Sequence, residues 1–154
     1  AKRLVWNAYN QVDRALYYRP SANSWTYTTA TIRQANNTAA NKIEAVAGLD
    51  GNSIAVDNWV MCSNGAAATT TFMAVGIGES STTANATGTI VMPATPLVAD
   101  YILSSSAHLK KHKSAGYHYY AMLEWSTAAN TTTWYGDNGA PTVRQSGISA
   151  TLRN

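Results

Sequence analysis

Charged residues are scarce in this sequence. Asp, Glu, Lys and Arg together make up 12 % of the 154 residues, which is about half of their usual share in globular proteins. Ala, Thr, Ser and Asn fill the deficit and predict a neutral, hydrogen-bonding surface. That composition is more typical of extracellular β proteins, virion shells and sugar-binding surfaces than of a metabolic enzyme of the cytosol.

Cysteine and long apolar runs are also nearly absent. Cys62 is the single cysteine, so an intrachain disulfide is excluded. Because Cys62 follows Trp59, Val60 and Met61, we expect a small buried hydrophobic residue, with a reactive thiol as the alternative. There is no apolar run of about 18 residues and no secretory signal, which predicts a chain without a membrane span.

The excess of positive charge is small. The formal net charge is +3, whereas proteins that bind nucleic acid concentrate basic charge on one surface. We therefore expect no nucleic-acid partner. The basic residues gather at two places, which are Lys2-Arg3 and His108-Leu109-Lys110-Lys111-His112-Lys113.

Sustained helical periodicity is missing, and period-two alternation recurs along the whole chain. Ile54, Val56 and Val60, for example, share one face of the stretch 53–62. Turn residues recur about every 8–12 positions. The pattern predicts one all-β domain over residues 1–154, a jelly-roll-like β-sandwich of about 8–10 strands. The predicted strands and short apolar pieces are residues 2–9, 14–19, 25–33, 43–47, 53–62, 69–77, 90–92, 101–104, 117–125, 131–135 and 146–153.

Three connections carry specific predictions. Asp50-Gly51 predicts a β-hairpin between the strands on either side, because glycine supplies the positive φ of a tight turn. Residues 34–41 are polar and predict a loop or a single helical turn. Residues 78–88 predict a flexible polar loop.

The aromatic stretch 116–139 is the centre of the predicted domain. Tyr117, Tyr119 and Trp125 alternate with His118 and Tyr120, so both faces of a strand here carry apolar bulk. Such a strand belongs inside a sandwich, or between a core and a subunit interface. Residues 131–135 predict a second strand, joined to the first through 128–130 as an aromatic hairpin.

These rings have more than one interpretation. Aromatic side chains fill cores and subunit interfaces, and they also stack on sugars. The candidates for an oligomer interface or for glycan stacking are Tyr117, Tyr119, Tyr120, Trp125, Trp134 and Tyr135.

Catalytic and metal-binding patterns are weak. Glu124 and Asp137 are the carboxylates nearest to the aromatic stretch, and a glycosidase needs two carboxyl groups facing each other across a sugar. Their spacing is not specific, so we predict neither catalytic residues nor a cofactor. His108 and His112 lie four positions apart without further ligands, and a metal on an oligomer axis, also involving His118, is the alternative to none.

The basic residues are candidates for contact with a partner. The segment 108–113 predicts a solvated loop, or a site that binds an anion or an acidic patch on another protein. Lys2 and Arg3 are the second candidate contact. As surface residues, Lys110, Lys111 and Lys113 should tolerate a joint change to Ser without loss of folding.

Several segments together resemble a known class of protein. They are WNAYNQV (6–12), SWTYTT (24–29), RQAN (33–36), GYHY (116–119), LE (123–124), TTWYGD (132–137) and SGI (146–148). The chain resembles structural proteins from the virion surface of tailed bacteriophages. Its strand content and aromatic Gly-Tyr-His-Tyr strand are also similar to the trimeric jelly-roll knobs of the tumour-necrosis-factor/C1q type.

The resemblance implies a non-enzymatic virion protein, assembled in the bacterial cytoplasm and present on the virion surface as a homotrimer. Fibre tips follow a shaft, and these residues show none, which favours a protein that decorates the capsid directly. The alternative is a receptor-binding knob or lectin-like module that binds glycans of the host surface. A glycan-cleaving enzyme is the third hypothesis.

Overall fold

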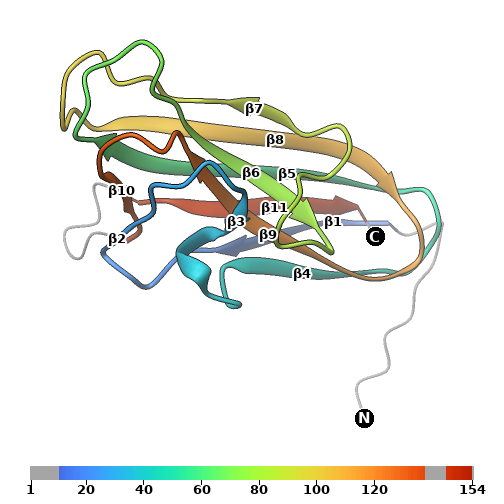
Figure 1. Cartoon of the computed structure of the whole chain (residues 1–154). Coiled ribbons are helices and arrows are strands. Elements are labelled where there is room, and N and C mark those ends of the chain that lie inside the picture. The colour runs from blue at the N-terminus through green and yellow to red at the C-terminus, as the bar shows by residue number, and fades with distance from the viewer. Residues whose placement is uncertain (1–10, 138–144, 154) are drawn as a thin grey trace.

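The computed structural model describes residues 11–137 and 145–153. In these residues the chain forms eleven strands and one short 3-10 helix, arranged as two antiparallel sheets that pack face to face (Figure 1). The predicted all-β sandwich is therefore confirmed. The predicted strand at residues 2–9 lies outside the described residues. The elements are β1 (Asp13–Tyr18), β2 (Ser24–Thr26), β3 (Arg33–Gln34), η1 (Ala35–Asn37), β4 (Lys42–Ala47), β5 (Asn52–Asn64), β6 (Met73–Glu79), β7 (Ile90–Met92), β8 (Leu103–Lys113), β9 (Gly116–Ser126), β10 (Thr132–Tyr135) and β11 (Gly147–Arg153).

One long strand organises each sheet. In the seven-stranded sheet, β5 pairs along one edge with β8, and its other edge is shared by β11 and β10. The strands β7, β1 and β2 extend this sheet beyond β8, β11 and β10. In the four-stranded sheet, β9 pairs with β6 on one edge and with β4 and β3 on the other.

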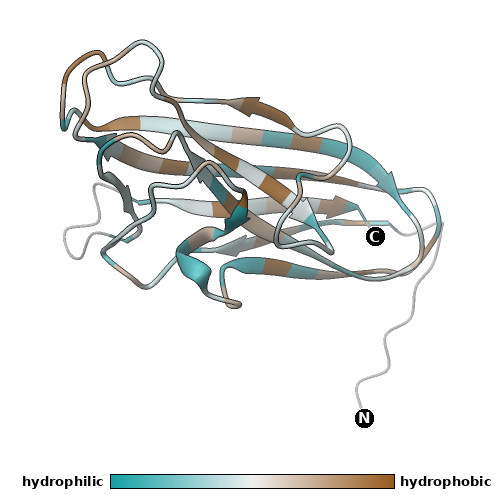
Figure 2. Ribbon diagram, viewed as in Figure 1, coloured by the Kyte–Doolittle hydropathy of each residue, from teal (hydrophilic) through white to brown (hydrophobic). Residues whose placement is uncertain are grey.

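The core lies between the two sheets. Ile54, Val56 and Val60 of β5 point into it, as the alternation predicted, and hydrophobic positions recur along both sheets in Figure 2. Cys62 is fully buried beside them. Burial raises the pKa of its thiol to about 12, so the side chain stays protonated and packs as a small hydrophobic residue. That prediction is confirmed.

Both predicted hairpins are wrong. Gly51 has the expected positive φ of +83°, but β4 belongs to one sheet and the following β5 to the other. In the same way, β9 and β10 lie in different sheets, and residues 127–131 cross between them. Alternation of apolar and polar residues identifies a strand, but it does not show which other strand pairs with it. A short polar turn can connect two strands of one sheet or two strands of different sheets.

The predicted strand at 25–33 is two short strands separated by a loop. β2 ends at Thr26 and β3 begins at Arg33. In between, the hydroxyl of Tyr27 donates to the backbone oxygen of Thr31 over 2.9 Å and stabilises a local turn. The following segment contains η1, which is the single helical turn predicted for residues 34–41, and Asn36 adopts a φ of 53° in it.

The outer face of β9 is covered by the chain itself. Ala121 and Leu123 are buried there, because the loop after β6 folds back over the sheet. Asn85 accepts a hydrogen bond from the N–H of Ile77 over 3.1 Å. A Cβ on Gly78 would lie 2.2 Å from the backbone oxygen of Ser81, so the close approach requires glycine. Burial of this part of β9 thus requires no symmetry mate.

Candidate functional site

The basic segment 108–113 is the second half of strand β8, which corrects the predicted loop. Alternation sends its side chains to opposite faces. His108, Lys110 and His112 point outward and are exposed, whereas Lys111 and Lys113 point toward the space between the sheets. A strand forms here because all of β8 pairs in register with β5, from Leu103 to Lys113. Lys2 and Arg3 lie outside the described residues.

The two inward lysines share one carboxylate. Lys111 Nζ lies 2.6 Å from Oε2 of Glu79, and Lys113 Nζ contacts Oε1 of the same side chain. His118 Nδ1 is 3.9 Å from Oε1. The Lys113 side chain is 5 % exposed, and burial lowers the pKa of its ammonium group. This cluster connects β6 of one sheet to β8 of the other.

Sequence reasoning missed Glu79. The sequence pattern places it in the polar loop predicted for residues 78–88, whereas in the structure it is the last residue of β6. The available indication was charge: Glu79 and Asp100 are the only charged residues between positions 58 and 107. Two lysines that point inward need a counter-charge, and that requirement could have identified it.

The structure changes the expected result of lysine replacement. Lys110→Ser should alter the free energy of unfolding by less than about 0.5 kcal/mol, because Lys110 is exposed. Lys113→Ser should lower it by about 2 kcal/mol, because Glu79 loses a buried partner. Urea denaturation of the two variants tests this, and equal stability would show that the buried contact is absent in solution. The joint change to Ser is therefore not expected to be neutral.

The histidines do not gather into a metal centre. His108 Nδ1 lies 2.6 Å from Asp57 Oδ1 on the outer face of the larger sheet, and His112 Nδ1 lies 2.9 Å from the backbone oxygen of Gly51. His118 belongs to the other sheet. Within residues 11–137 and 145–153, no group of three or more His, Cys, Asp or Glu side chains is placed to hold a metal ion.

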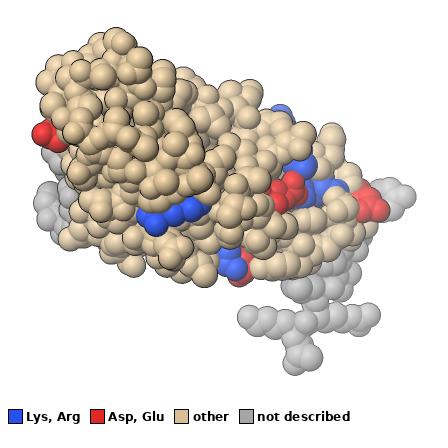
Figure 3. Space-filling model, in the orientation of Figure 1, with Lys and Arg blue, Asp and Glu red and all other residues tan. Residues whose placement is uncertain are grey.

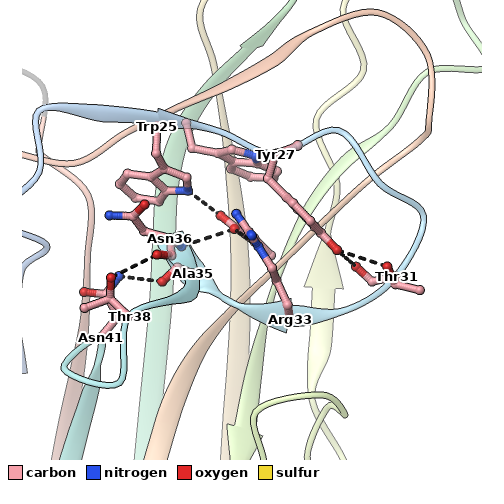
Figure 4. A network of polar contacts seen from close by, with 10 residues as sticks. Trp25, Tyr27, Thr31, Arg33, Ala35, Asn36, Thr38 and Asn41 are labelled. Atoms are coloured by element: carbon pink, nitrogen blue, oxygen red, sulfur yellow. Dashed lines mark hydrogen bonds and ion pairs between the residues drawn. The ribbon is translucent and has the colours of Figure 1, made fainter.

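Glu124 is buried and accepts from a network of polar groups, of which Trp25, Arg33 and Asn36 are labelled in Figure 4. Its carboxylate accepts hydrogen bonds from Trp25 Nε1 over 2.6 Å, from Arg33 Nε over 2.7 Å and from the backbone N–H of Asn36 over 3.1 Å. The Arg33 guanidinium stacks 3.7 Å above the ring of Tyr27. Burial raises the pKa of Glu124, and the three donors partly offset that effect.

This network joins β2, β3 and η1 to β9. Asp137, the other carboxylate of the predicted pair, follows β10 in the opposite sheet, and its backbone N–H donates to Ala22. All three contacts of Glu124 are to the protein's own groups, so the arrangement stabilises the fold.

The aromatic candidates fall into three groups. Tyr120 and Trp134 are fully buried in the core. Trp125 and Tyr135 are half-buried, and the hydroxyl of Tyr135 lies 3.2 Å from that of Ser63. Trp125 also lines an apolar pocket of about 280 Å³ on the outer face of the smaller sheet. The remaining two candidates, Tyr117 and Tyr119, face outward beside β4.

A groove runs between the edge strands β1 and β4, which belong to different sheets and lie next to each other in Figure 1. Its volume is about 420 Å³. Lys42 and Glu44 line it, and Tyr117 bonds to Glu44 from the neighbouring strand β9. The other lining residues are Leu16, Tyr17, Tyr18, Ala40 and Ile43. We name this site the β1–β4 groove.

One end of the sandwich is apolar and almost uncharged. The loops 65–72 and 93–102 lie side by side there, joined by a hydrogen bond from the N–H of Ala68 to the oxygen of Pro96. Figure 3 shows this end largely without charge, with basic and acidic side chains gathered nearer the opposite end and along the lower side. Its exposed large hydrophobic residues are Phe72, Met92, Leu97, Val98 and Tyr101. We name this surface the apolar end.

No protein-family model and no curated protein matches the sequence of this chain. The described part of the chain contains no helix long and apolar enough to cross a bilayer.

Proposed function

We propose that this protein is a non-enzymatic structural protein of a tailed-bacteriophage virion, which decorates the outer face of the capsid. Three observations support the proposal. Several segments resemble virion-surface proteins, the fold is a β-sandwich of low charge, and one end exposes clustered hydrophobic residues. The apolar end is the main support for attachment to the capsid, because exposed apolar patches rimmed by polar residues are typical of protein–protein contact sites.

We propose that the apolar end binds the capsid, instead of the basic segment 108–113 that the sequence suggests. Lys111 and Lys113 are engaged by Glu79 inside the molecule, so of the three lysines only Lys110 is free to meet an acidic shell. Leu97 and Val98, by contrast, are 73 % and 61 % exposed on one loop. An apolar contact is also insensitive to salt, whereas surface ion pairs are screened.

Sedimentation with purified capsids tests the attachment. We expect the parent protein to co-sediment equally at low and high salt, and Leu97→Asp with Val98→Asp to reduce the bound fraction at least tenfold, because two charges would be buried at the contact. Lys110→Ser is the matched control and should bind like the parent. Binding that disappears at high salt and survives the double change would contradict the role of the apolar end.

We further propose that the protein is a homotrimer on the virion surface, as in the jelly-roll knobs that it resembles. Cyclic assembly lets identical surfaces close around one axis. Light scattering should then give three times the chain mass of 16.5 kDa. A single-chain mass at micromolar concentration would rule the trimer out.

The second candidate function is the binding of host-surface glycans, as a receptor-binding knob or lectin-like module. The β1–β4 groove favours it, because the exposed ring of Tyr17 lines the groove together with an amine and a carboxylate. Binding to a glycan array, without adsorption to capsids, would support this function over decoration.

A further inference from the structure

The β1–β4 groove has the size of a ligand-binding site and is lined by polar side chains that can form further hydrogen bonds. Its volume of about 420 Å³ lies within the range of small-molecule sites. Among the described strands, β1 pairs with β11 and β4 pairs with β9, and the groove lies between β1 and β4. The groove therefore presents side chains of two different sheets to a ligand.

Tyr117 is an exposed ring held in one position. It is 57 % exposed, yet its hydroxyl donates to Oε1 of Glu44 over 2.6 Å. The same oxygen lies 2.6 Å from Lys42 Nζ, and that ammonium group is 5.2 Å from the centre of the Tyr119 ring. Because these contacts already fix the side chains, a ligand that stacks on Tyr117 has little ordering entropy to overcome.

The pair Lys42–Glu44 retains free hydrogen-bonding groups. Glu44 Oε2 bonds to none of residues 11–137 and 145–153, and an ammonium group has three N–H donors, of which Glu44 takes one. Hydrogen bonds from Lys42 and Tyr117 lower the pKa of Glu44, so the carboxylate stays ionised at neutral pH. A free acceptor and free donors thus lie side by side at the groove.

We propose that the β1–β4 groove binds a neutral sugar residue of a polysaccharide. One hydroxyl of a vicinal diol donates to Glu44 Oε2, its neighbour accepts from Lys42 Nζ, and the C–H face of the ring stacks on Tyr117. Tyr17, which is 79 % exposed, supplies a second ring at the groove. This inference deepens the glycan-binding function and is independent of attachment to capsids.

The charges of the groove select against other ligands. Lys42 and Glu44 cancel each other, so the groove attracts neither an anionic nor a cationic polymer strongly. An extended peptide added to the edge of β4 is the competing ligand, but exposed charges on an edge strand disfavour such pairing. A sugar uses the carboxylate, the amine and the ring together.

The test is a titration of the whole chain, followed by ¹H–¹⁵N NMR. The probes are neutral hexasaccharides of α-glucan, β-glucan, mannan and galactan type, an acidic polyglucuronate oligomer, and an alternating Val-Thr octapeptide. We expect at least one neutral hexasaccharide to shift the signals of Lys42, Glu44 and Tyr117. Tyr117→Ala should weaken its affinity about tenfold, which equals the loss of one aromatic contact.

Further variants separate the possible outcomes. Glu44→Gln should weaken binding of the neutral sugar, and Trp59→Ala, an exposed ring on the opposite sheet, should leave it unchanged. A parent that binds glycan equally well after Tyr117→Ala and Glu44→Gln would overturn this site while the glycan-binding function stands. A parent that binds no neutral hexasaccharide, or binds only the octapeptide or the acidic oligomer, would overturn the inference.

Discussion

Replacement of Glu124 by Ala should lower the free energy of unfolding by about 3–5 kcal/mol, the range found when one partner of a buried ion pair is removed. The carboxylate is 1 % exposed. Without it, Trp25 Nε1, Arg33 Nε and the N–H of Asn36 lose their common acceptor. The contacts of β2, β3 and η1 with β9 depend on that acceptor.

Urea denaturation measures the effect, and Asp57→Ala is the matched control. Asp57 also pairs with a basic side chain, His108, but about half of each side chain is exposed, so the control should lose less than about 1 kcal/mol. Equal losses of unfolding free energy in the two variants would show that burial does not strengthen the contacts of Glu124.

The same carboxylate predicts a dependence on pH. Burial raises the pKa of Glu124 in the folded protein above the usual value of 4.5, so the folded state takes up a proton before the unfolded state does. The contribution of Glu124 is therefore complete below pH 4.5 and decreases as the pH rises through the folded pKa. The parent should gain stability relative to Glu124→Gln as the pH falls from neutral toward 4.5, and a constant difference would contradict the raised pKa.

Replacement of Glu79 by Ala is expected to cost about 3 kcal/mol, because it leaves Lys113 buried without a counter-charge and frees Lys111 beside it. In that background, Lys113→Met should restore part of the stability, since it removes the uncompensated charge and keeps the aliphatic chain. The double-mutant cycle should therefore show a coupling of at least about 1 kcal/mol. Additive losses would mean that the two side chains do not interact.

At Lys113, stability changes with pH in the direction opposite to that expected at Glu124. Burial lowers the pKa of Lys113 below 10.5, so the charged form costs stability at neutral pH and the cost disappears as the pH rises to 10.5. The Glu79→Ala variant should accordingly recover stability in mildly alkaline solution. Denaturation curves at neutral pH and near 10 test this, and Glu79→Ala with Lys113→Met should show no such recovery.

The sequence by itself determined the fold class and the burial of much of the chain. The alternation in residues 53–62 identified β5 and its inward face, and the same period along the chain correctly predicted an all-β sandwich. The composition around Cys62 correctly predicted a buried thiol. These predictions succeed because a strand's faces follow from its own residues, one position at a time.

Only the tertiary structure decided which strands pair, and therefore which side chains meet. Asp50-Gly51 and residues 127–131 both cross between sheets, because the same turn residues serve a hairpin or a crossing. Glu79 meets Lys111 and Lys113, and Glu124 meets Arg33, across 32 to 91 positions of sequence. The β1–β4 groove likewise joins strands from different sheets. Such contacts follow from how the two layers stack, and local residue patterns do not encode that stacking.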